Sequence, residues 1–138
     1  MAEIIYSHSP EETERVGEAL AGRFRGRVLA ITGDLGAGKT ALIRGLARGL
    51  GYTGQVTSPT FAIVNDYRVG GVTVLYHFDI YRLDADGLYD IGWDDYLAGN
   101  VTTAVEWAEN AEELMPGDAV CVHLTGSGDD VREIRLTY

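Results

Sequence analysis

Cysteine is nearly absent from this chain of 138 residues, and long apolar runs are absent altogether. The single cysteine, Cys121, excludes a disulfide within the chain, and its neighbours Val120 and Val122 predict a small core residue. No stretch approaches the roughly 18 uninterrupted apolar residues of a membrane helix, and the acidic N-terminus lacks the basic and then apolar layout of a signal peptide. We therefore expect a cytoplasmic protein that makes no membrane contact.

Positive charge is scarce as well. Acidic residues outnumber basic ones by 21 to 11, which gives a formal net charge of −10. A surface of this charge repels a phosphate backbone, so direct, tight binding of RNA or DNA is not expected. Lys39 is the only lysine, and all other basic residues are arginines.

Size and composition are those of one globular domain that covers residues 1–138. The chain is 46% hydrophobic and 23% charged, which is ordinary for a domain, and it is too short to build a second core. No internal repeat or low-complexity stretch interrupts it.

Hydrophobic spacing predicts alternating helices and strands. Residues 9–12, Ser-Pro-Glu-Glu, have the form of a capping box, and a short apolar run that ends in Gly33 is typical of a strand buried on both faces. The pair Gly70-Gly71 is the composition of a tight hairpin turn. The expected elements are a helix over 10–24, a strand over 28–32, a helix over 40–50, hairpin strands over 61–69 and 72–79, one or two short helices within 84–99, a strand over 101–107, a helical turn over 108–114, and paired strands over 119–125 and 131–137.

Residues 33–40 read Gly-Asp-Leu-Gly-Ala-Gly-Lys-Thr, a complete phosphate-binding loop of the Walker A type between a strand and a helix. The glycines let backbone N–H groups turn inward around phosphate oxygens, and the helix N-terminus adds its dipole. Lys39 is placed to neutralise the β and γ phosphates, and the Thr40 hydroxyl to bind Mg²⁺. The nucleotide-binding residues expected from this segment are Gly33, Asp34, Leu35, Gly36, Ala37, Gly38, Lys39, Thr40 and Ala41.

The element order and this loop together predict an α/β fold. We expect a three-layer sandwich of the P-loop NTPase type, with a sheet of mixed parallel and antiparallel strands. The site of such a sheet lies at the C-terminal ends of its strands. A nucleoside triphosphate with Mg²⁺ is the expected ligand.

Two carboxylates follow apolar strands and are candidates for a magnesium site. Asp79 ends the segment 72–79, and Glu106 lies near the end of the segment 101–106. Either could bind Mg²⁺, directly or through water, while the other orients the attacking water as a base. Together with Lys39, these two residues are the catalytic candidates, and the sequence does not assign the two carboxylate roles.

Three further features admit more than one interpretation. The segment 84–87, Asp-Ala-Asp-Gly, has the spacing of a GTPase switch, but a guanine-recognition motif needs a second lysine that the chain lacks. His77 is expected to pack in the core, because no zinc-ligand spacing surrounds it. Trp107 fits equally a core position and a position against a nucleotide or a partner.

Four segments together resemble the bacterial TsaE family, formerly YjeE, the ATPase of tRNA threonylcarbamoyladenosine biosynthesis. They are the loop at 33–40, Ser-Pro-Thr-Phe at 58–61, His-Phe-Asp-Ile-Tyr-Arg-Leu at 77–83 and Val-Glu-Trp at 105–107, in that order and at similar spacing. The resemblance covers most of the chain. It implies a small ATPase that uses ATP and Mg²⁺ and supports turnover of the TsaB–TsaD complex, with tRNA reached only through that complex.

The resemblance also implies roles for individual residues. The family's metal ligands fall on Thr40 and Glu106, and its strand-end aspartate on Asp79. Its switch-like threonine falls on Thr60, and Trp107 is expected to be switch-like as well. The family's nucleotide-contacting arginine of the closing hairpin falls on Arg132. Departures such as Ala41, where threonine is frequent, do not touch the expected metal site.

Two other functions use the same loop. A small-molecule kinase also needs an acceptor pocket and an arginine-bearing lid, which Arg68 and Arg82 do not visibly form. A nucleotide-dependent switch module binds ATP and hydrolyses it only as a timer.

Overall fold

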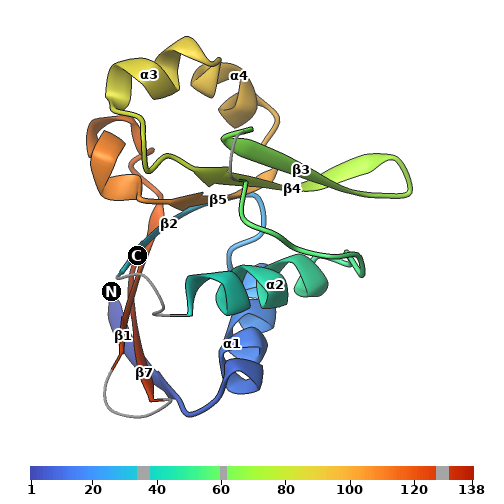
Figure 1. The fold of residues 1–138 in the computed structure, drawn as a ribbon, viewed down its shortest axis with the longest axis vertical. Coiled ribbons are helices and arrows are strands. Elements are labelled where there is room, and N and C mark those ends of the chain that lie inside the picture. The colour runs from blue at the N-terminus through green and yellow to red at the C-terminus, as the bar shows by residue number, and fades with distance from the viewer. Residues whose placement is uncertain (34–37, 60–61, 127–130) are drawn as a thin grey trace.

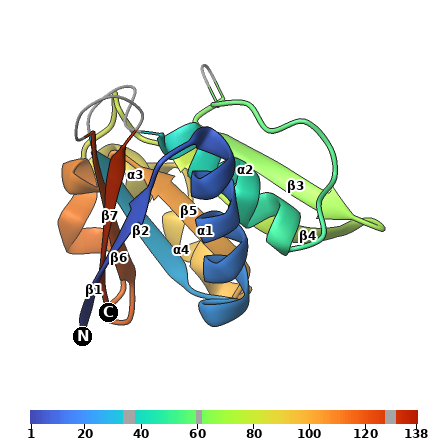
Figure 2. The ribbon, with the colours of Figure 1, turned by 90° about the horizontal axis from the view of Figure 1, so that it is seen from below.

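The computed structural model describes residues 1–33, 38–59, 62–126 and 131–138. Within these ranges a seven-stranded sheet lies between two layers of helices (Figures 1 and 2). The elements in chain order are β1 (Ala2–Ser7), α1 (Pro10–Arg23), β2 (Val28–Gly33), α2 (Lys39–Gly49), β3 (Val64–Val69), β4 (Val72–Asp79), α3 (Ala85–Asp90), α4 (Trp93–Ala98), β5 (Thr102–Glu106), the 3₁₀ helix η1 (Ala108–Leu114), β6 (Val120–Gly126) and β7 (Arg132–Thr137).

The sheet combines parallel and antiparallel strands in the order β1-β7-β6-β2-β5-β4-β3. Four central strands run parallel, with β2 between β6 and β5, and β4 beside β5. The outer pairs β1–β7, β6–β7 and β3–β4 are antiparallel. The predicted α/β sandwich with a mixed sheet is therefore confirmed, and the ends of β2, β4 and β5 meet at one edge.

Each face of the sheet carries its own core. Figure 1 shows α1 and α2 on one side and α3 and α4 on the other. On the second side Phe78 packs edge-on against Trp93 with ring centroids 5.2 Å apart, and the Trp93 indole N–H donates to the Leu114 carbonyl at 3.0 Å. Among the helices that the structure describes, none is long and apolar enough to cross a membrane.

The predicted elements lie within a few residues of the observed ones, with two differences. The strand β1 was not expected; it is an edge strand whose partner, β7, lies at the far end of the chain. The prediction of a core position for Cys121 is wrong, because the residue is exposed. Alternate residues of β6, including Val120 and Val122, point into the core, while Cys121 points to the other face of the sheet, where it is exposed.

Glycines allow α1 and α2 to approach at backbone distance. A Cβ atom built on Gly45 of α2 would lie 1.8 Å from the Glu14 carbonyl oxygen of α1, and one built on Gly17 would lie 2.1 Å from the Leu42 carbonyl oxygen. Glu14 also pairs with Arg48 of α2 at 3.0 Å. This close contact fixes the N-termini of both helices on the same side of the molecule.

Gly45→Ala should therefore destabilise the protein, because the added methyl group forces the two helices apart. We expect a loss of about 1–3 kcal/mol in the free energy of unfolding, measured by urea denaturation. Gly22→Ala is the matched control: it lies in α1 with open space around its Cβ position, so it should stabilise by about 0.5–1 kcal/mol. Equal effects of the two substitutions would contradict the helix contact.

Candidate functional site

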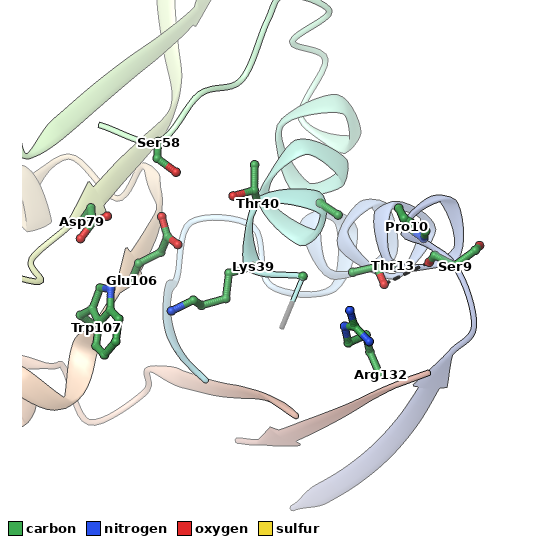
Figure 3. A pocket seen from close by; sticks show the side chains of 12 residues that line it. Ser9, Pro10, Thr13, Lys39, Thr40, Ser58, Asp79, Glu106, Trp107 and Arg132 are labelled. Atoms are coloured by element: carbon green, nitrogen blue, oxygen red, sulfur yellow. Dashed lines mark hydrogen bonds between the residues drawn. The ribbon is translucent and has the colours of Figure 1, made fainter. Parts of the chain in front are cut away.

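A cavity of about 370 Å³ opens at the C-terminal ends of the central strands, beside the N-termini of α1 and α2 (Figure 3). Its wall collects most of the site residues that the sequence predicted and the structure describes. These are Gly38, Lys39, Thr40, Ala41, Asp79, Glu106, Trp107 and Arg132. They come from four separate parts of the chain, so the fold brings together residues that lie far apart in the sequence.

Some predicted residues are not in this wall. Gly33 ends β2 and enters the site only through its carbonyl oxygen. Four predicted nucleotide-binding residues and the switch-like threonine lie outside the described residues, so their positions stay predictions. They are Asp34, Leu35, Gly36, Ala37 and Thr60.

The N-terminus of α2 faces the cavity. Gly38 is its N-cap residue and has a φ of 96°, a left-handed conformation that glycine adopts without strain. Glycine has no side chain to cap the helix, so the first N–H groups of α2 are offered to a ligand. Together with the helix dipole, this end of α2 is a ready anion-binding site.

Lys39 is buried against the protein in this structure. Its side chain is only 6% exposed, and its Nζ atom donates to the Gly33 carbonyl at 2.9 Å. The same Nζ lies 4.2 Å from the centre of the Trp107 ring, within cation–π distance. The ammonium group thus lies between the end of β2 and Trp107, at the edge of the cavity.

Trp107 contributes to both the core and the cavity. Its backbone has a φ of 62°, which is uncommon for a residue with a side chain and carries a cost of about 1–3 kcal/mol. The indole packs against the core on the side of α3 and α4, and against the Tyr81 ring at a centroid distance of 4.9 Å. Trp107 therefore packs against the core and also lines the cavity, while its contact with a nucleotide or a partner stays a prediction.

The two predicted carboxylates lie side by side. Asp79 and Glu106 are register partners on the parallel strands β4 and β5. Burial raises the pKa of Asp79 above its ordinary value of 3.8; the Tyr81 N–H, which donates to Asp79 Oδ1 at 3.0 Å, opposes that rise, and the nearby Glu106 adds to it. Asp79 is thus a stronger proton acceptor than an exposed aspartate.

Glu106 is held by a residue that sequence reasoning assigned only to packing. Its Oε2 atom lies 2.7 Å from Nε2 of His77, and both side chains are buried. The expected burial of His77 is confirmed, but its bond to Glu106 was missed. The two residues are 29 positions apart, so only the pairing of β4 with β5 reveals that they meet.

The donor set around the cavity fits a small, hard cation. Figure 3 shows the Thr40 hydroxyl, the Glu106 carboxylate and the Asp79 carboxylate around the same space. All three are oxygen donors of the kind that Mg²⁺ prefers, and the phosphates of a nucleotide supply further oxygens. The residues present therefore fit a magnesium ion.

Arg132 adds a cation from the far end of the chain. It begins β7 and lies beside Gly38, where a built Cβ would approach its Cγ and Nε atoms to 3.9 Å. One of its guanidinium nitrogens, Nη1, donates to the Val131 carbonyl at 3.1 Å. The predicted nucleotide-contacting arginine is thus in the cavity wall, next to the start of α2.

Four lining residues were not predicted: Ser9, Pro10, Thr13 and Ser58. The first three belong to the start of α1, where Ser9 caps the helix by accepting from the Glu12 N–H at 3.1 Å. The capping box revealed this helix but not that it begins opposite α2. Ser58 belongs to the segment 58–61, on which the resemblance partly rests, so the sequence did contain a motif that could have marked Ser58 as a site residue.

Comparisons with known proteins agree with this arrangement. The model of the family described as "Threonylcarbamoyl adenosine biosynthesis protein TsaE" matches residues 7–134. A tRNA threonylcarbamoyladenosine biosynthesis protein TsaE from Bacillus subtilis (strain 168) is 44% identical over 94% of this chain and 81% of its own length. One of the same name from Treponema pallidum (strain Nichols) is 37% identical over 94% and 96%.

A solved structure extends the likeness to three dimensions. The crystal structure of YdiB from Bacillus subtilis superposes with a TM-score of 0.80 and 36% identity, and the match covers 99% of this chain and 84% of that one. The family model runs from the last residue of β1 into β7 and so includes every residue of the cavity wall described above. The chain therefore belongs to the TsaE family of tRNA threonylcarbamoyladenosine biosynthesis.

Proposed function

We propose that this protein binds ATP with Mg²⁺, hydrolyses it, and thereby supports turnover of the TsaB–TsaD complex that places threonylcarbamoyl on tRNA adenosine next to the anticodon. One observation carries the proposal. A helix N-terminus with an adjacent lysine faces two register-paired carboxylates across one cavity. That arrangement joins a phosphate site to a cation site, and membership of the family supplies the pathway.

The phosphates bind at the start of α2. Backbone N–H groups of this helix donate hydrogen bonds to the phosphate oxygens. Lys39 leaves its contacts with Gly33 and Trp107 and binds the β and γ phosphates instead. Arg132, which lies beside Gly38, approaches the same phosphates. These positive groups concentrate in one cavity of a protein whose net charge is −10.

The hydroxyl of Thr40 and the carboxylate of Glu106 hold the cation. Magnesium, when bound, neutralises charge that develops on the phosphate oxygens. Asp79 orients the attacking water and accepts its proton, a role that its raised pKa favours. This assignment uses the different environments of the two carboxylates: Glu106 is bonded to the buried ring of His77, whereas Asp79 accepts the backbone N–H of Tyr81.

A hydrolase accounts for the cavity better than a small-molecule kinase does. Among the residues described, the only arginine of the cavity wall is Arg132. Arg68 lies on β3 and pairs with Asp66 at 3.1 Å, and Arg82 is absent from the wall. Neither arginine forms the lid that phosphoryl transfer to a metabolite uses.

The acidic surface supports a protein partner rather than direct contact with tRNA. A net charge of −10 opposes tight binding to a phosphate backbone. We therefore place the tRNA on the TsaB–TsaD complex and this chain beside that complex.

The first test measures ATP hydrolysis by the purified protein, alone and with TsaB–TsaD, together with threonylcarbamoyladenosine formed on tRNA over many turnovers. We expect slow hydrolysis alone, stimulation by the complex, sustained modification, and loss of all three when Mg²⁺ is chelated. Phosphate transfer to a metabolite would support the kinase instead. ATP binding without stimulated hydrolysis or sustained modification would leave only a nucleotide-dependent switch.

Lys39→Ala should weaken ATP binding by about 100-fold, because truncation of one partner in a buried charge pair costs about 2–5 kcal/mol. Isothermal titration calorimetry measures the change directly. Arg44→Ala is the control on the same helix; Arg44 pairs with Glu14 at 3.5 Å on the outer surface, so its loss should leave ATP affinity unchanged. An unaltered affinity in the Lys39 variant would remove that residue from the site.

Asp79→Asn should have opposite effects on activity and stability. Hydrolysis should fall on the order of 100-fold, because the amide accepts no proton. Without nucleotide and metal, the variant should be more stable than wild type at pH 7. The folded-state pKa of Asp79 is raised, so the wild type loses stability as the pH rises above 3.8, and the variant is spared that loss.

Urea unfolding along a pH series checks the stability difference, which should shrink as the pH falls toward 3.8. The amide still accepts the Tyr81 N–H, so the local turn is preserved. Glu106→Ala should lower hydrolysis as well, through the cation rather than the water. Normal hydrolysis in the Asp79 variant would contradict its proposed role.

A further inference from the structure

His77 bonds to a residue of the site without lining the cavity itself. We propose that His77 is a positioning residue: its Nε2–H group fixes the Glu106 carboxylate in the orientation that receives the magnesium ion. The inference rests on the proposed function, since it gives the carboxylate of Glu106 to the cation. It adds a residue that acts through Glu106 and touches neither nucleotide nor metal.

Strand register brings His77 to Glu106. On the parallel pair β4–β5, His77 is the partner of Ala104, and Asp79 is the partner of Glu106. Residues two positions apart on a strand share a face, so His77 and Glu106 are diagonal neighbours on one face of the sheet. Ala104 presents only a methyl group opposite His77, which leaves room for the imidazole to lean toward Glu106.

The direction of the hydrogen bond follows from the groups involved. An ionised carboxylate only accepts, so Nε2 of His77 donates to Oε2 of Glu106 at 2.7 Å. The bond engages one of the two carboxylate oxygens and leaves Oε1 as the oxygen to meet a cation. A glutamate side chain has three rotatable bonds and loses conformational entropy when it is ordered. If the side chain is already ordered in the folded protein, this entropy is not lost again when the cation binds.

The second imidazole nitrogen argues against a purely structural role. Nδ1 of His77 is buried, and no hydrogen-bond partner for it exists among the described residues. An unpaired buried polar atom is unfavourable, and an apolar side chain of similar size would avoid it. Histidine therefore carries a cost at this position that packing alone does not explain, while its other nitrogen serves Glu106.

The surroundings of His77 hold its ring in place. The side chain is fully buried, and the ring stacks on Tyr67 at a centroid distance of 6.3 Å. Tyr67 in turn donates its hydroxyl to the Thr57 carbonyl at 3.2 Å. Because the ring is rigid and lies on a central strand, its N–H donor keeps one position, and a donor in one position can orient a metal ligand.

The test uses two substitutions of His77 and one control. His77→Leu removes the donor together with the unpaired Nδ1, whereas His77→Gln keeps an N–H donor near the position of Nε2. Thr103→Val is the control, because it removes a buried hydroxyl from β5, the strand of Glu106, and this hydroxyl donates to the Val101 carbonyl at 2.9 Å. Each variant is measured for ATP binding across a magnesium series, for hydrolysis, and for urea unfolding.

For His77→Leu we expect the magnesium concentration that gives half-maximal ATP binding to rise about 10-fold, and hydrolysis to fall by a similar factor. ATP binding without magnesium should stay unchanged. His77→Gln should restore most of both losses, and Thr103→Val should show neither.

A wild-type magnesium requirement in His77→Leu would overturn the proposal. The proposal would also be overturned if His77→Gln were as impaired as His77→Leu and both variants were less stable than wild type, since this pattern marks a structural role. The magnesium series does not need turnover. If the wild type binds magnesium and ATP but hydrolyses nothing, the proposed function fails while the role of His77 is still decided.

Discussion

The parallel register between β4 and β5 determines where the chemistry of this protein lies. It places Asp79 opposite Glu106 at the end of both strands, and it sets His77 diagonally behind Glu106. A shift of one residue in either strand would turn one of these side chains to the other face of the sheet. The proposed cation site and its support by His77 therefore share a single geometric cause.

The cavity wall carries charges of both signs, since Asp79 and Glu106 lie in it together with Lys39 and Arg132, whereas the molecule as a whole is acidic. The first turns of α1 and α2 both face the cavity, and Lys39 and Arg132 add two full charges there. The remaining surface carries most of the acidic side chains of a chain with net charge −10. The two helix starts and the two cations favour an anion on their side of the cavity, while the acidic exterior repels nucleic acid. The glycine contact of α1 with α2 holds both helix starts in place.

Sequence reasoning recovered the elements whose signals are local. The helix α2 after the predicted loop, the capping box before α1 and the Gly70-Gly71 turn each have signals within a few residues, and the mixed sheet followed from the order of the elements. What it missed depends on distant pairing. The strand β1 needs β7 to be recognised, and the bond from His77 to Glu106 needs the register of β4 with β5. Cys121 was misplaced because neighbours in sequence on a strand point to opposite faces.

The exposed position of Cys121 makes this protein unusually simple to label. Because it is the only cysteine, a maleimide dye or spin label attaches at one defined point without prior mutagenesis. That point lies on β6, on the sheet face turned away from α1 and α2. A probe there would report the approach of a second protein to this face, while the opposite core remains chemically untouched.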